Sequence, residues 1–381
     1  MFGWRGRLFE AALWALGRVD TCRRLNHEVR SVFVLRNNDL GDLLVTTPLF
    51  QALKERFPNA RICVGAGDWA RDILRHNPFV TEVLSCNAPW ANKFVSNQSS
   101  SAAFRYIWRS PESFALKTHR FDVGIDSFGS GFGGLLLWRI GVRYRMGVYG
   151  LCGGWSASQW AAPFSWSEHV SVANLRFAEH LGASDIPEPK PQIFLSDAER
   201  RHGADLWFER SSKRRLIRIV IGHGAGDAAK CWPLANFTQL TNRLAARGDV
   251  ELVIAGGAAD RSSGEEIASN CPGARSLAGK LSLRKTFALL SHADLVICNG
   301  SMLAHAAAAF RRRTIVLLGP LYPSARDYEL LWGYPDLGLV MGPEGDRRIT
   351  SAEEALARID EEIYALQASS GVLPGQFLKS S

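Results

Sequence analysis

No stretch of this sequence is apolar for long enough to cross a membrane. A spanning helix needs about 20 consecutive apolar residues, and charged residues make up 22% of the chain. The N-terminal segment resembles a secretory signal peptide only in outline. Its apolar centre, Ala11–Leu16, is short and follows Glu10, and no convincing small-residue cleavage site comes after it. We therefore expect a cytoplasmic protein and not an exported, two-lobed solute-binding protein.

Cysteine is sparse and irregularly placed. The seven cysteines are odd in number and show no C-x-x-C spacing; they are Cys22, Cys63, Cys86, Cys152, Cys231, Cys271 and Cys298. This distribution predicts reduced, mostly structural thiols. The sequence has no Asp-x-Asp metal motif either. We expect no metal ligands and no cofactor.

The chain lacks the signatures of nucleic-acid binding, although its net charge of +8 and isoelectric point near 9.3 favour an anionic partner. It has no zinc finger, aromatic-rich RNA-binding signature or helix-turn-helix pattern. We therefore exclude nucleic acid and retain an anionic membrane surface and a phosphorylated substrate. An amphipathic N-terminal helix is predicted, either packed on its domain or touching a membrane; its arginines are Arg5, Arg7, Arg18, Arg23 and Arg24.

Strand-like and helix-like segments alternate through both halves of the chain, the pattern of βαβ units and parallel sheets. The first half has expected strands at Val32–Leu35, Ala60–Val64, Thr81–Ser85, Phe121–Ile125 and Tyr144–Val148. The second half has expected strands at Leu216–Ile221, Glu251–Ala255, Leu295–Cys298 and Thr314–Leu318, and helices at Leu234–Ala246, Asp260–Asn270, Leu283–Ser291 and Ser301–Phe310. We predict an α/β protein with two doubly wound domains.

A proline-rich stretch, IPEPKPQI at 186–193, separates the two halves and predicts a connector. Ser196-Asp197-Ala198-Glu199 then suits a helix start. The glycines at 129–134 and 150–154 predict mobile loops with acceptor contacts, and 87–120 is hard to assign. The predicted organisation is an N-terminal segment 1–30, a first domain 31–185, a linker 186–195, a second domain 196–350, a closing helix 351–368 and a disordered tail 369–381.

The segment Arg36–Ile62 places an acid between a strand and a helix. The turn Leu40-Gly41-Asp42 ends a polar loop, and apolar residues at helical spacing follow. Open α/β sheets bind ligands at such strand ends, where a lone carboxylate can serve as a general base. Asp42 equally suits a helix-start acid stabilised by the helix dipole. Asp39 is a rival acid that spacing alone does not exclude.

A second strand-to-helix turn is Gly222–Pro233, GHGAGDAAKCWP. Its glycines, Gly224 among them, let backbone N–H groups approach phosphate oxygens, and Lys230 adds a mobile charge. The Walker A spacing is absent. A plain turn with a solvated lysine is the alternative.

A third turn, Ala255–Asp260 (AGGAAD), follows another expected strand. Gly257 leaves room for the face of a nucleotide, and Asp260 suits a ribose hydroxyl. A helix-capping aspartate is the alternative.

The fourth turn lies in Cys298–Ala309, CNGSMLAHAAAA. The backbone around Gly300, Ser301 and Met302 offers N–H groups to an anion at a helix start. His305 lies about one helical turn further on, within reach of the same anion, or is a structural histidine. A phosphate-rich donor bound by the second half, with an acid supplied by the first, is the simplest interpretation.

The ordered series of motifs resembles glycosyltransferase family 9, the ADP-heptose:lipopolysaccharide heptosyltransferases, over roughly residues 31–342. Seven stretches carry the resemblance: LGDLLVTTPLFQALKERFPNARI, FDVGIDSFGSG, EHVSVANLRFAEHLGA, GHGAGDAAKCWPLANFTQL, AGGAAD, LAGKLSLRKTFALLSHADLVICNGSMLAHAAAA and TIVLLGPLYP. The order of these motifs is far more specific than any one of them.

The resemblance implies a GT-B architecture, two facing Rossmann-like domains with a cleft between them. The first domain would bind a lipid-linked saccharide acceptor, and the second a nucleotide-activated heptose. By motif position, Asp42 corresponds to the family's proposed general base and Lys230 to its phosphate-contacting lysine. The expected donor-binding residues are Gly41, Gly224, Gly257, Asp260, Gly300, Ser301, Met302 and His305.

One departure concerns the last motif, which in the family usually reads Asp-Ser/Thr-Gly-x-x-His. Here Gly300 replaces the acid and Met302 replaces the glycine. Backbone N–H donation survives this change, whereas a contact that needs the carboxylate does not. We predict an inverting, metal-independent glycosyltransferase, cytoplasmic or peripheral on the inner face of the inner membrane. The alternative is a noncatalytic member that binds nucleotide or glycan as an assembly or regulatory partner.

Overall fold

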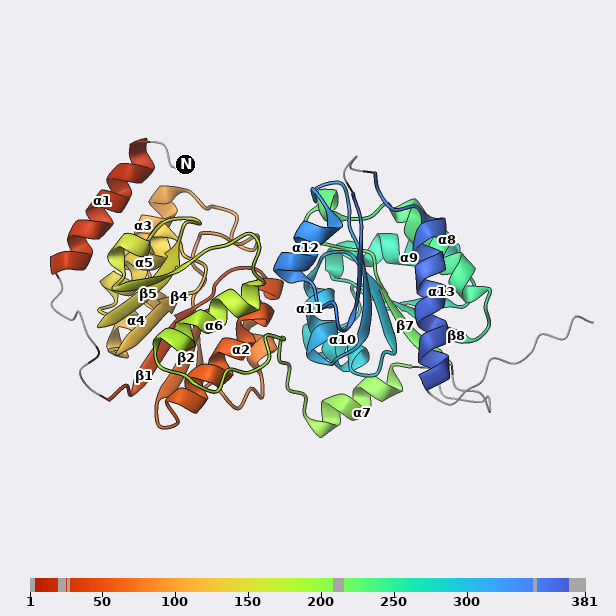
Figure 1. Ribbon diagram of the computed structural model, residues 1–381, viewed down its shortest axis with the longest axis horizontal. Coiled ribbons are helices and arrows are strands. Elements are labelled where there is room, and N and C mark those ends of the chain that lie inside the picture. The colour runs from red at the N-terminus through yellow and green to blue at the C-terminus, as the bar shows by residue number, and fades with distance from the viewer. Residues whose placement is uncertain (1–3, 20–24, 26–27, 208–215, 345–347, 370–381) are drawn as a thin grey trace, which may run out of the picture. The chain divides into compact units, whose positions relative to one another are not determined.

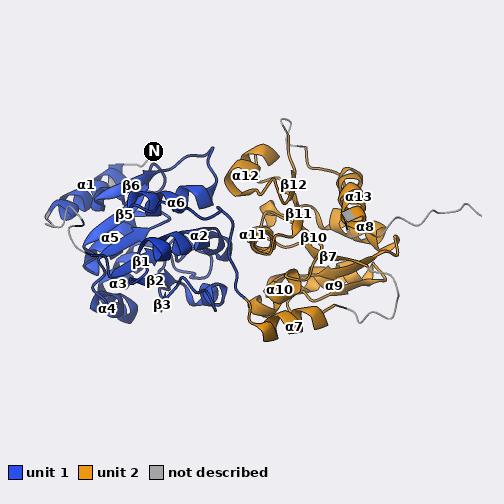
Figure 2. Ribbon diagram, turned by 60° about the horizontal axis from the view of Figure 1, so that its bottom comes forward, with its two compact units in different colours: residues 1–194 blue, residues 195–381 orange. Residues whose placement is uncertain are grey.

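The computed structural model describes residues 4–19, 25, 28–207, 216–344 and 348–369. The chain divides into two compact units, unit 1 (Met1–Phe194) and unit 2 (Leu195–Ser381) (Figure 2). Arg23 and Arg24, predicted to flank the N-terminal helix, and residues 370–381 of the predicted tail lie outside the described residues. No helix within the described ranges is long and apolar enough to span a membrane.

Unit 1 is built on a parallel sheet of six strands in the order β3-β2-β1-β4-β5-β6 (Figure 1). The strands are β1 (Ser31–Leu35), β2 (Arg61–Ala66), β3 (Glu82–Ser85), β4 (Val123–Asp126), β5 (Tyr144–Tyr149) and β6 (Trp160–Pro163). This is the 3-2-1-4-5-6 order of dinucleotide-binding folds, whose ligands bind where the order reverses. In unit 1 that point lies at the carboxyl ends of β1 and β4.

Unit 2 repeats the arrangement. Its strands are β7 (Ile217–Gly222), β8 (Val250–Ile254), β9 (Ala274–Ser276), β10 (Leu295–Cys298), β11 (Arg313–Leu317) and β12 (Gly338–Met341). The sheet order β12-β11-β10-β7-β8-β9 is again 3-2-1-4-5-6 when counted within the unit. The reversal therefore falls between β7 and β10, whose following loops contain two of the predicted binding turns.

Helices flank both sheets. Those of unit 1 are α1 (Trp4–Val19), α2 (Leu40–Arg56), α3 (Ser100–Arg109), α4 (Pro111–Thr118), α5 (Gly131–Arg139) and α6 (Val170–His180). Those of unit 2 are α7 (Asp197–Asp205), α8 (Leu234–Ala245), α9 (Arg261–Ser269), α10 (Leu283–Leu290), α11 (Met302–Ala309), α12 (Ala325–Trp332) and α13 (Ala352–Ser369). The predicted α/β class with two doubly wound sheets is confirmed, and each unit has its own apolar core.

The strands and helices expected from the sequence are all present, with ends that differ by at most two residues. The strands β6, β9 and β12 were not predicted, and the segment left unassigned contains α3 and α4. The predicted closing helix is α13, which packs beside α8 (Figure 1). The predicted helix start after the connector is also confirmed, because Ser196 and Glu199 form a capping box at α7.

The prediction of a loop at 129–134 is wrong from Gly131 onward, because α5 begins there. The reason is tertiary packing. A Cβ at Gly133 would lie 2.2 Å from Asp126 Oδ2, and one at Gly134 would lie 2.6 Å from the carbonyl oxygen of Gly154. These glycines let α5 approach the loops beside it, so their number reflects close packing and not a mobile segment.

Helix α2 carries Pro48 in its interior, which removes the backbone donor that would reach the carbonyl of Leu44. The Thr47 hydroxyl replaces that donor, with Oγ1 2.7 Å from the Leu44 oxygen. The helix therefore continues through the proline, and its first turn holds the predicted catalytic acid at a fixed place after β1.

Helix α1 packs on unit 1. Leu13 is fully buried, and the ring of Phe9 lies 5.9 Å from that of Phe104 in α3. Glu10 accepts hydrogen bonds from the backbone of Gly154 and the hydroxyl of Ser156. The interpretation of α1 as a helix packed on its own domain is therefore confirmed.

Candidate functional site

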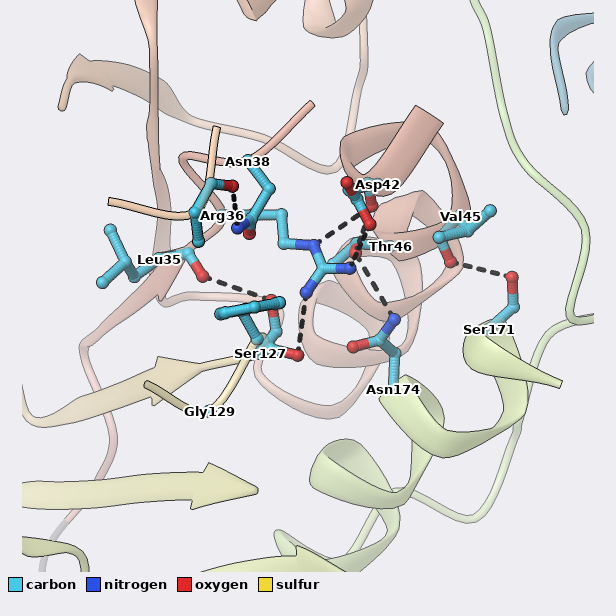
Figure 3. Close-up of polar contacts among 12 residues, drawn as sticks. Leu35, Arg36, Asn38, Asp42, Val45, Thr46, Ser127, Gly129, Ser171 and Asn174 are labelled. Atoms are coloured by element: carbon cyan, nitrogen blue, oxygen red, sulfur yellow. Dashed lines mark hydrogen bonds and ion pairs between the residues drawn. The ribbon is translucent and has the colours of Figure 1, made fainter. Parts of the chain in front are cut away.

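The predicted acid Asp42 lies in the first turn of α2 and pairs with Arg36 at the end of β1 (Figure 3). Arg36 Nη2 donates to Asp42 Oδ1 at 3.1 Å, Nε donates to the Asp42 carbonyl at 3.2 Å, and Nη1 donates to the Ser127 carbonyl at 3.0 Å. The Arg36 side chain is 4% exposed and that of Asp42 is 28% exposed. The guanidinium thus fixes the carboxylate on one side while solvent reaches it on another.

Asp126 supports the same site from the end of β4. Its carboxylate accepts backbone hydrogen bonds from Phe128, Gly129 and Ser130, the last at 2.7 Å. Burial raises the pKa of Asp126, and these backbone donors and Arg36 oppose the rise. The carboxylate organises the turn at positive-φ Gly129, which presents the Ser127 carbonyl to Arg36.

Asp39, the rival acid, is the N-terminal residue flanking α2, and its side chain makes no capping hydrogen bond. Its Oδ1 instead accepts a hydrogen bond from the backbone N–H of Lys93 at 3.3 Å. Asp39 therefore holds a neighbouring loop, whereas Asp42 is oriented by a buried cation.

In unit 2, Lys230 ends the short 3₁₀ turn Ala228–Lys230 in the loop after β7. Its side chain is half-buried, and its ammonium makes no hydrogen bond or ion pair with a residue that the structure describes. Its carbonyl accepts a hydrogen bond from Gly319 N at 3.1 Å. The backbone of the loop is therefore tied down, while the cationic end of the side chain is available to an anion.

Asn299 joins the two loops at the reversal point of the sheet. It is fully buried after β10, its Nδ2 donates to the His223 carbonyl at 2.6 Å, and its Oδ1 accepts from Trp232 N at 2.9 Å. The loop 223–232 is thus held at both ends by one side-chain amide. Sequence reasoning did not select Asn299, because nothing in its local motif reveals these partners.

The predicted ribose residue, Asp260, lies against two of the predicted glycines. Asp260 Oδ2 accepts a hydrogen bond from Gly257 N at 2.8 Å, and a Cβ at Gly224 would lie 2.1 Å from Asp260 Oδ1. The loops after β7 and β8 therefore meet through this carboxylate. Asp260 also flanks the start of α9, but its side chain makes no capping hydrogen bond to that helix. The carboxylate turns back to Gly257 instead, and the ribose contact stays a prediction.

The turn predicted between β10 and α11 is present, with Ser301 as the flanking residue and Met302 as the first helical residue. Anion binding at this turn stays a prediction. Ser301 Oγ is buried and has no hydrogen-bond partner in the described part of the chain. His305 is 6% exposed, and its Nδ1 lies 3.0 Å from the hydroxyl of Tyr334. The imidazole is thus held by an aromatic neighbour within the unit.

The space beside Gly300 is occupied by two tyrosines. A Cβ at Gly300 would lie 2.7 Å from Tyr322 Oη and 2.8 Å from Tyr328 Cε2. The Tyr322 hydroxyl donates to the Gly300 carbonyl at 3.2 Å, and burial raises the pKa of Tyr322 to about 12, so it stays a donor at neutral pH. No acidic side chain fits at this position without displacing a ring.

Tyr322 reaches this place through the loop after β11. Leu321 N donates to the Ala229 carbonyl at 2.9 Å, next to Lys230. The loop is therefore anchored on the same 3₁₀ turn that carries the lysine. Lys230, Gly300 and Tyr322 thus gather where β7, β10 and β11 end. Tyr322 is a candidate site residue that the sequence motif did not reveal.

The site residues predicted from the sequence fall into two groups. Gly41 and Asp42 belong to unit 1; Lys230, Gly224, Gly257, Asp260, Gly300, Ser301, Met302 and His305 belong to unit 2. Within each unit they follow the carboxyl ends of strands at or beside the reversal point. The predicted cleft between the domains stays a prediction.

Two sequence comparisons with known proteins both find heptosyltransferases. A family model described as glycosyltransferase family 9 (heptosyltransferase) matches residues 113–326, more than half of the chain. Lipopolysaccharide heptosyltransferase 2 of Salmonella typhimurium is 26% identical over 362 residues, which cover 90% of this chain and 99% of that protein.

Solved structures resemble the fold over nearly its whole length. The family 9 glycosyl transferase of Veillonella parvula superimposes with a TM-score of 0.74 at 16% identity. The ADP-heptose lipopolysaccharide heptosyltransferase II of Escherichia coli superimposes with a TM-score of 0.68 at 23% identity. Each comparison covers 90% of this chain and 99% of the other. This likeness confirms the predicted GT-B type of fold, with two Rossmann-like units.

Proposed function

The chain belongs to glycosyltransferase family 9, the heptosyltransferase family, and we propose that it transfers a heptose-type sugar from ADP-heptose to a lipopolysaccharide core or related saccharide. The transfer would invert the anomeric configuration and need no metal ion. Glycosyl transfer itself follows from the family. The donor, the acceptor and the residue roles below are the proposal.

Asp42 is the general base of this proposal. It would take the proton from the acceptor hydroxyl as the oxygen attacks the anomeric carbon, and attack on the face opposite the diphosphate inverts the configuration. The observation that carries the assignment is the Arg36–Asp42 pair at the carboxyl end of β1. Two hydrogen bonds from Arg36 reach Asp42 in the first turn of α2, and a third, to the Ser127 carbonyl, holds the guanidinium in place. The carboxylate therefore has a defined direction.

The leaving ADP gains negative charge as the glycosidic bond breaks. Lys230 and the backbone N–H groups at the start of α11 would stabilise that charge. The uncommitted ammonium of Lys230 supports this role, as does its position at the reversal point of the second sheet. Asp260 would accept a ribose hydroxyl of the nucleotide beside Gly224 and Gly257.

The test measures ADP release and the mass of the acceptor product with ADP-heptose and a truncated lipopolysaccharide core. We expect Asp42→Asn to lower kcat by about 10²–10⁴ because the proton acceptor is lost. Asp39→Asn is the matched control, since it removes the same charge three residues earlier, and it should retain the rate within a few-fold. Full transfer by a folded Asp42→Asn variant would refute the base assignment.

The same assay tests Lys230. We expect Lys230→Met to lower kcat by about 10²–10³, or about 2.7–4 kcal/mol, as removal of an oxyanion donor does. Lys285→Met removes an exposed lysine from α10 and should leave kcat unchanged. An unchanged kcat in Lys230→Met would remove the lysine from the mechanism.

The noncatalytic alternative is favoured by one observation, the tyrosines that fill the space beside Gly300. It predicts that calorimetry detects binding of ADP-heptose while mass spectrometry detects no mass increment on any core acceptor. Transfer to a core acceptor excludes it.

A lipid-linked acceptor places the substrate at a membrane, and unit 1 has a surface that suits one. This α1–α3 aromatic face consists of Trp4, Leu8 and Trp14 of α1 with Phe104 and Trp108 of α3, all between 40% and 68% exposed. Exposed arginines Arg7, Arg18, Arg105 and Arg109 lie on the same two helices. The two helices touch through the rings of Phe9 and Phe104. Exposed aromatic and cationic side chains on such a pair of helices favour anionic lipid headgroups.

Vesicle sedimentation tests the α1–α3 aromatic face. We expect the protein to bind vesicles that contain phosphatidylglycerol, and Leu8→Asp to weaken that binding about tenfold because it removes buried apolar area. Leu330→Asp, at an exposed leucine of α12, is the matched control. Equal binding by both variants would contradict peripheral membrane contact through this face.

A further inference from the structure

A second cluster of reactive side chains lies in unit 1, away from Asp42. Cys63 of β2, Glu82 of β3 and His119 at the end of α4 place their sulfur, carboxylate and imidazole atoms within 4.8 Å of one another. Cys63 is buried, His119 half-buried and Glu82 exposed. The cluster lies toward the amino ends of the strands, whereas Asp42 follows the carboxyl end of β1.

Strand register and ring stacking bring the side chains of Cys63, Glu82 and His119 together. Cys63 and Glu82 are partners in the parallel register of β2 and β3, so their side chains lie next to each other on the sheet. The His119 ring stacks on Phe121 with an interplanar angle of 4°, and Arg61 Nη2 donates to the His119 carbonyl at 3.5 Å. Arg120, which lies between His119 and Phe121 in the sequence, has φ +50°. This left-handed backbone conformation costs energy for a residue with a side chain.

The polar atoms of the three groups, the Cys63 sulfur, the Glu82 carboxylate and the His119 ring nitrogens, are free of hydrogen bonds and salt bridges within the described part of the chain. Cys86 provides a contrast, since this buried cysteine accepts a hydrogen bond from the Tyr106 hydroxyl at 3.3 Å. The thiol, the imidazole and the carboxylate lie close together but make no hydrogen bonds with described residues. Such a group of side chains suits the binding of a metal ion better than a hydrogen-bond network.

We propose that Cys63, Glu82 and His119 bind one zinc ion. Thiolate, imidazole and carboxylate are the ligands that Zn²⁺ takes in proteins, and three of them leave a fourth tetrahedral position for water. Tetrahedral ligands at about 2.0–2.3 Å from the metal lie about 3.3–3.8 Å apart. The three ligand atoms lie within 4.8 Å of one another, so they have to close by at most about 1.5 Å. The exposed Glu82 and the half-buried His119 would supply that movement around the buried Cys63.

Zinc binding also changes the chemistry of the thiol. Burial raises the pKa of Cys63 to about 11, so the metal-free side chain is a neutral thiol at neutral pH. Zinc binds the thiolate and releases that proton. The bound ion would tie the edge strand β3 to β2 and to the connection between α4 and β4. We assign it a stabilising role in unit 1 and no part in sugar transfer.

The experiment measures the metal content of untagged full-length protein after dialysis against micromolar zinc. We expect about one zinc per chain, and a thiolate-to-metal charge-transfer band when cobalt replaces it. Glu82→Gln and His119→Gln should each weaken zinc binding about tenfold or more in a chelator competition. Glu179→Gln and Cys271→Ala, at an exposed glutamate and at a buried cysteine outside the cluster, are the controls and should retain the affinity.

Three outcomes decide the proposal. Stoichiometric zinc that depends on Glu82 and His119 supports it, and loss of zinc in Cys63→Ala strengthens that result if the variant folds. Glu82→Gln changes only an exposed side chain and decides the matter if Cys63→Ala does not fold. A wild-type protein without stoichiometric zinc, or with zinc retained unchanged in Glu82→Gln and His119→Gln, overturns the proposal.

Discussion

Arg36 is a buried cation with its charge balanced by Asp42 and, further off, by Asp126. Burial lowers the pKa of Arg36, and the two carboxylates oppose that change. An uncompensated charge is costly when little solvent reaches it. Removal of the Asp42 charge therefore affects the stability of unit 1 as well as the chemistry, and the two effects have to be measured separately.

Asp42→Asn should lower the free energy of unfolding of unit 1 by about 1–3 kcal/mol, because Arg36 loses an ionic partner but keeps an oxygen acceptor. Urea unfolding followed by the fluorescence of the unit 1 tryptophans measures this loss. Asp39→Asn should lose less than about 0.5 kcal/mol, since its side chain accepts one weak backbone hydrogen bond. Identical unfolding curves for the two variants would show that Arg36 does not depend on Asp42.

Gly300 has no room for a side chain, so Gly300→Ala should destabilise unit 2 by about 1–3 kcal/mol through overpacking against Tyr322 and Tyr328. The measurement is the unfolding free energy of the full chain in urea. Tyr322→Ala in the same chain should recover part of the loss, because it removes the nearer of the two clashing atoms. An alanine tolerated at 300 without cost would show that the tyrosines move freely.

At the scale of elements, one ion pair joins α7 to α10. Arg284 donates two hydrogen bonds of 2.7 Å to the Glu199 carboxylate, and Glu199 also closes the capping box with Ser196. Hydrogen bonding to Arg284 lowers the pKa of Glu199 from 4.5 to about 2. A depressed carboxylate pKa stabilises the folded state above the unfolded pKa, and this stability disappears as the pH falls through the folded pKa.

Glu199→Gln should therefore cost unit 2 about 2–3 kcal/mol at pH 7 and almost nothing near pH 2. The wild type should lose this increment between about pH 5 and pH 2, while the variant should show a flatter profile. Urea unfolding across that range measures the difference. Asp197→Asn, in the same helical turn and 87% exposed, should follow the wild type. Parallel profiles for Glu199→Gln and the wild type would contradict the role of Arg284.

The elements that the sequence predicted are those with a local signal. Nine of the twelve strands in the described residues were predicted from short apolar runs, whereas β6, β9 and β12 at the sheet edges were not. The Gly41-Asp42 turn is contiguous in the chain. Arg36, Asn299 and Tyr322 escaped prediction because their roles depend on partners from other strands and loops. The glycines of α5 were misinterpreted for the same reason, since only the folded structure shows what lies against them.

At the scale of the whole molecule, each unit has a complete sheet and a separate core. In unit 2 that core includes Trp232, Phe237 and, from α13, Ile359 and Ile363. A domain with its own buried core is expected to fold alone. A chain of residues 195–381 should therefore unfold cooperatively and bind ADP with the affinity of the full chain within about tenfold, as measured by calorimetry. A chain that folds but does not bind ADP would show that unit 1 contributes to nucleotide binding.

The tyrosines beside Gly300 also constrain how this protein could change over evolutionary time. An aspartate at 300 would clash with Tyr322 and Tyr328 while both rings stay in place. A single substitution of Gly300 by aspartate is therefore costly, and a change at Tyr322 or Tyr328 is expected to accompany it. The residue at position 300 is thus coupled to the two tyrosines, and related sequences that keep both rings are expected to keep the glycine.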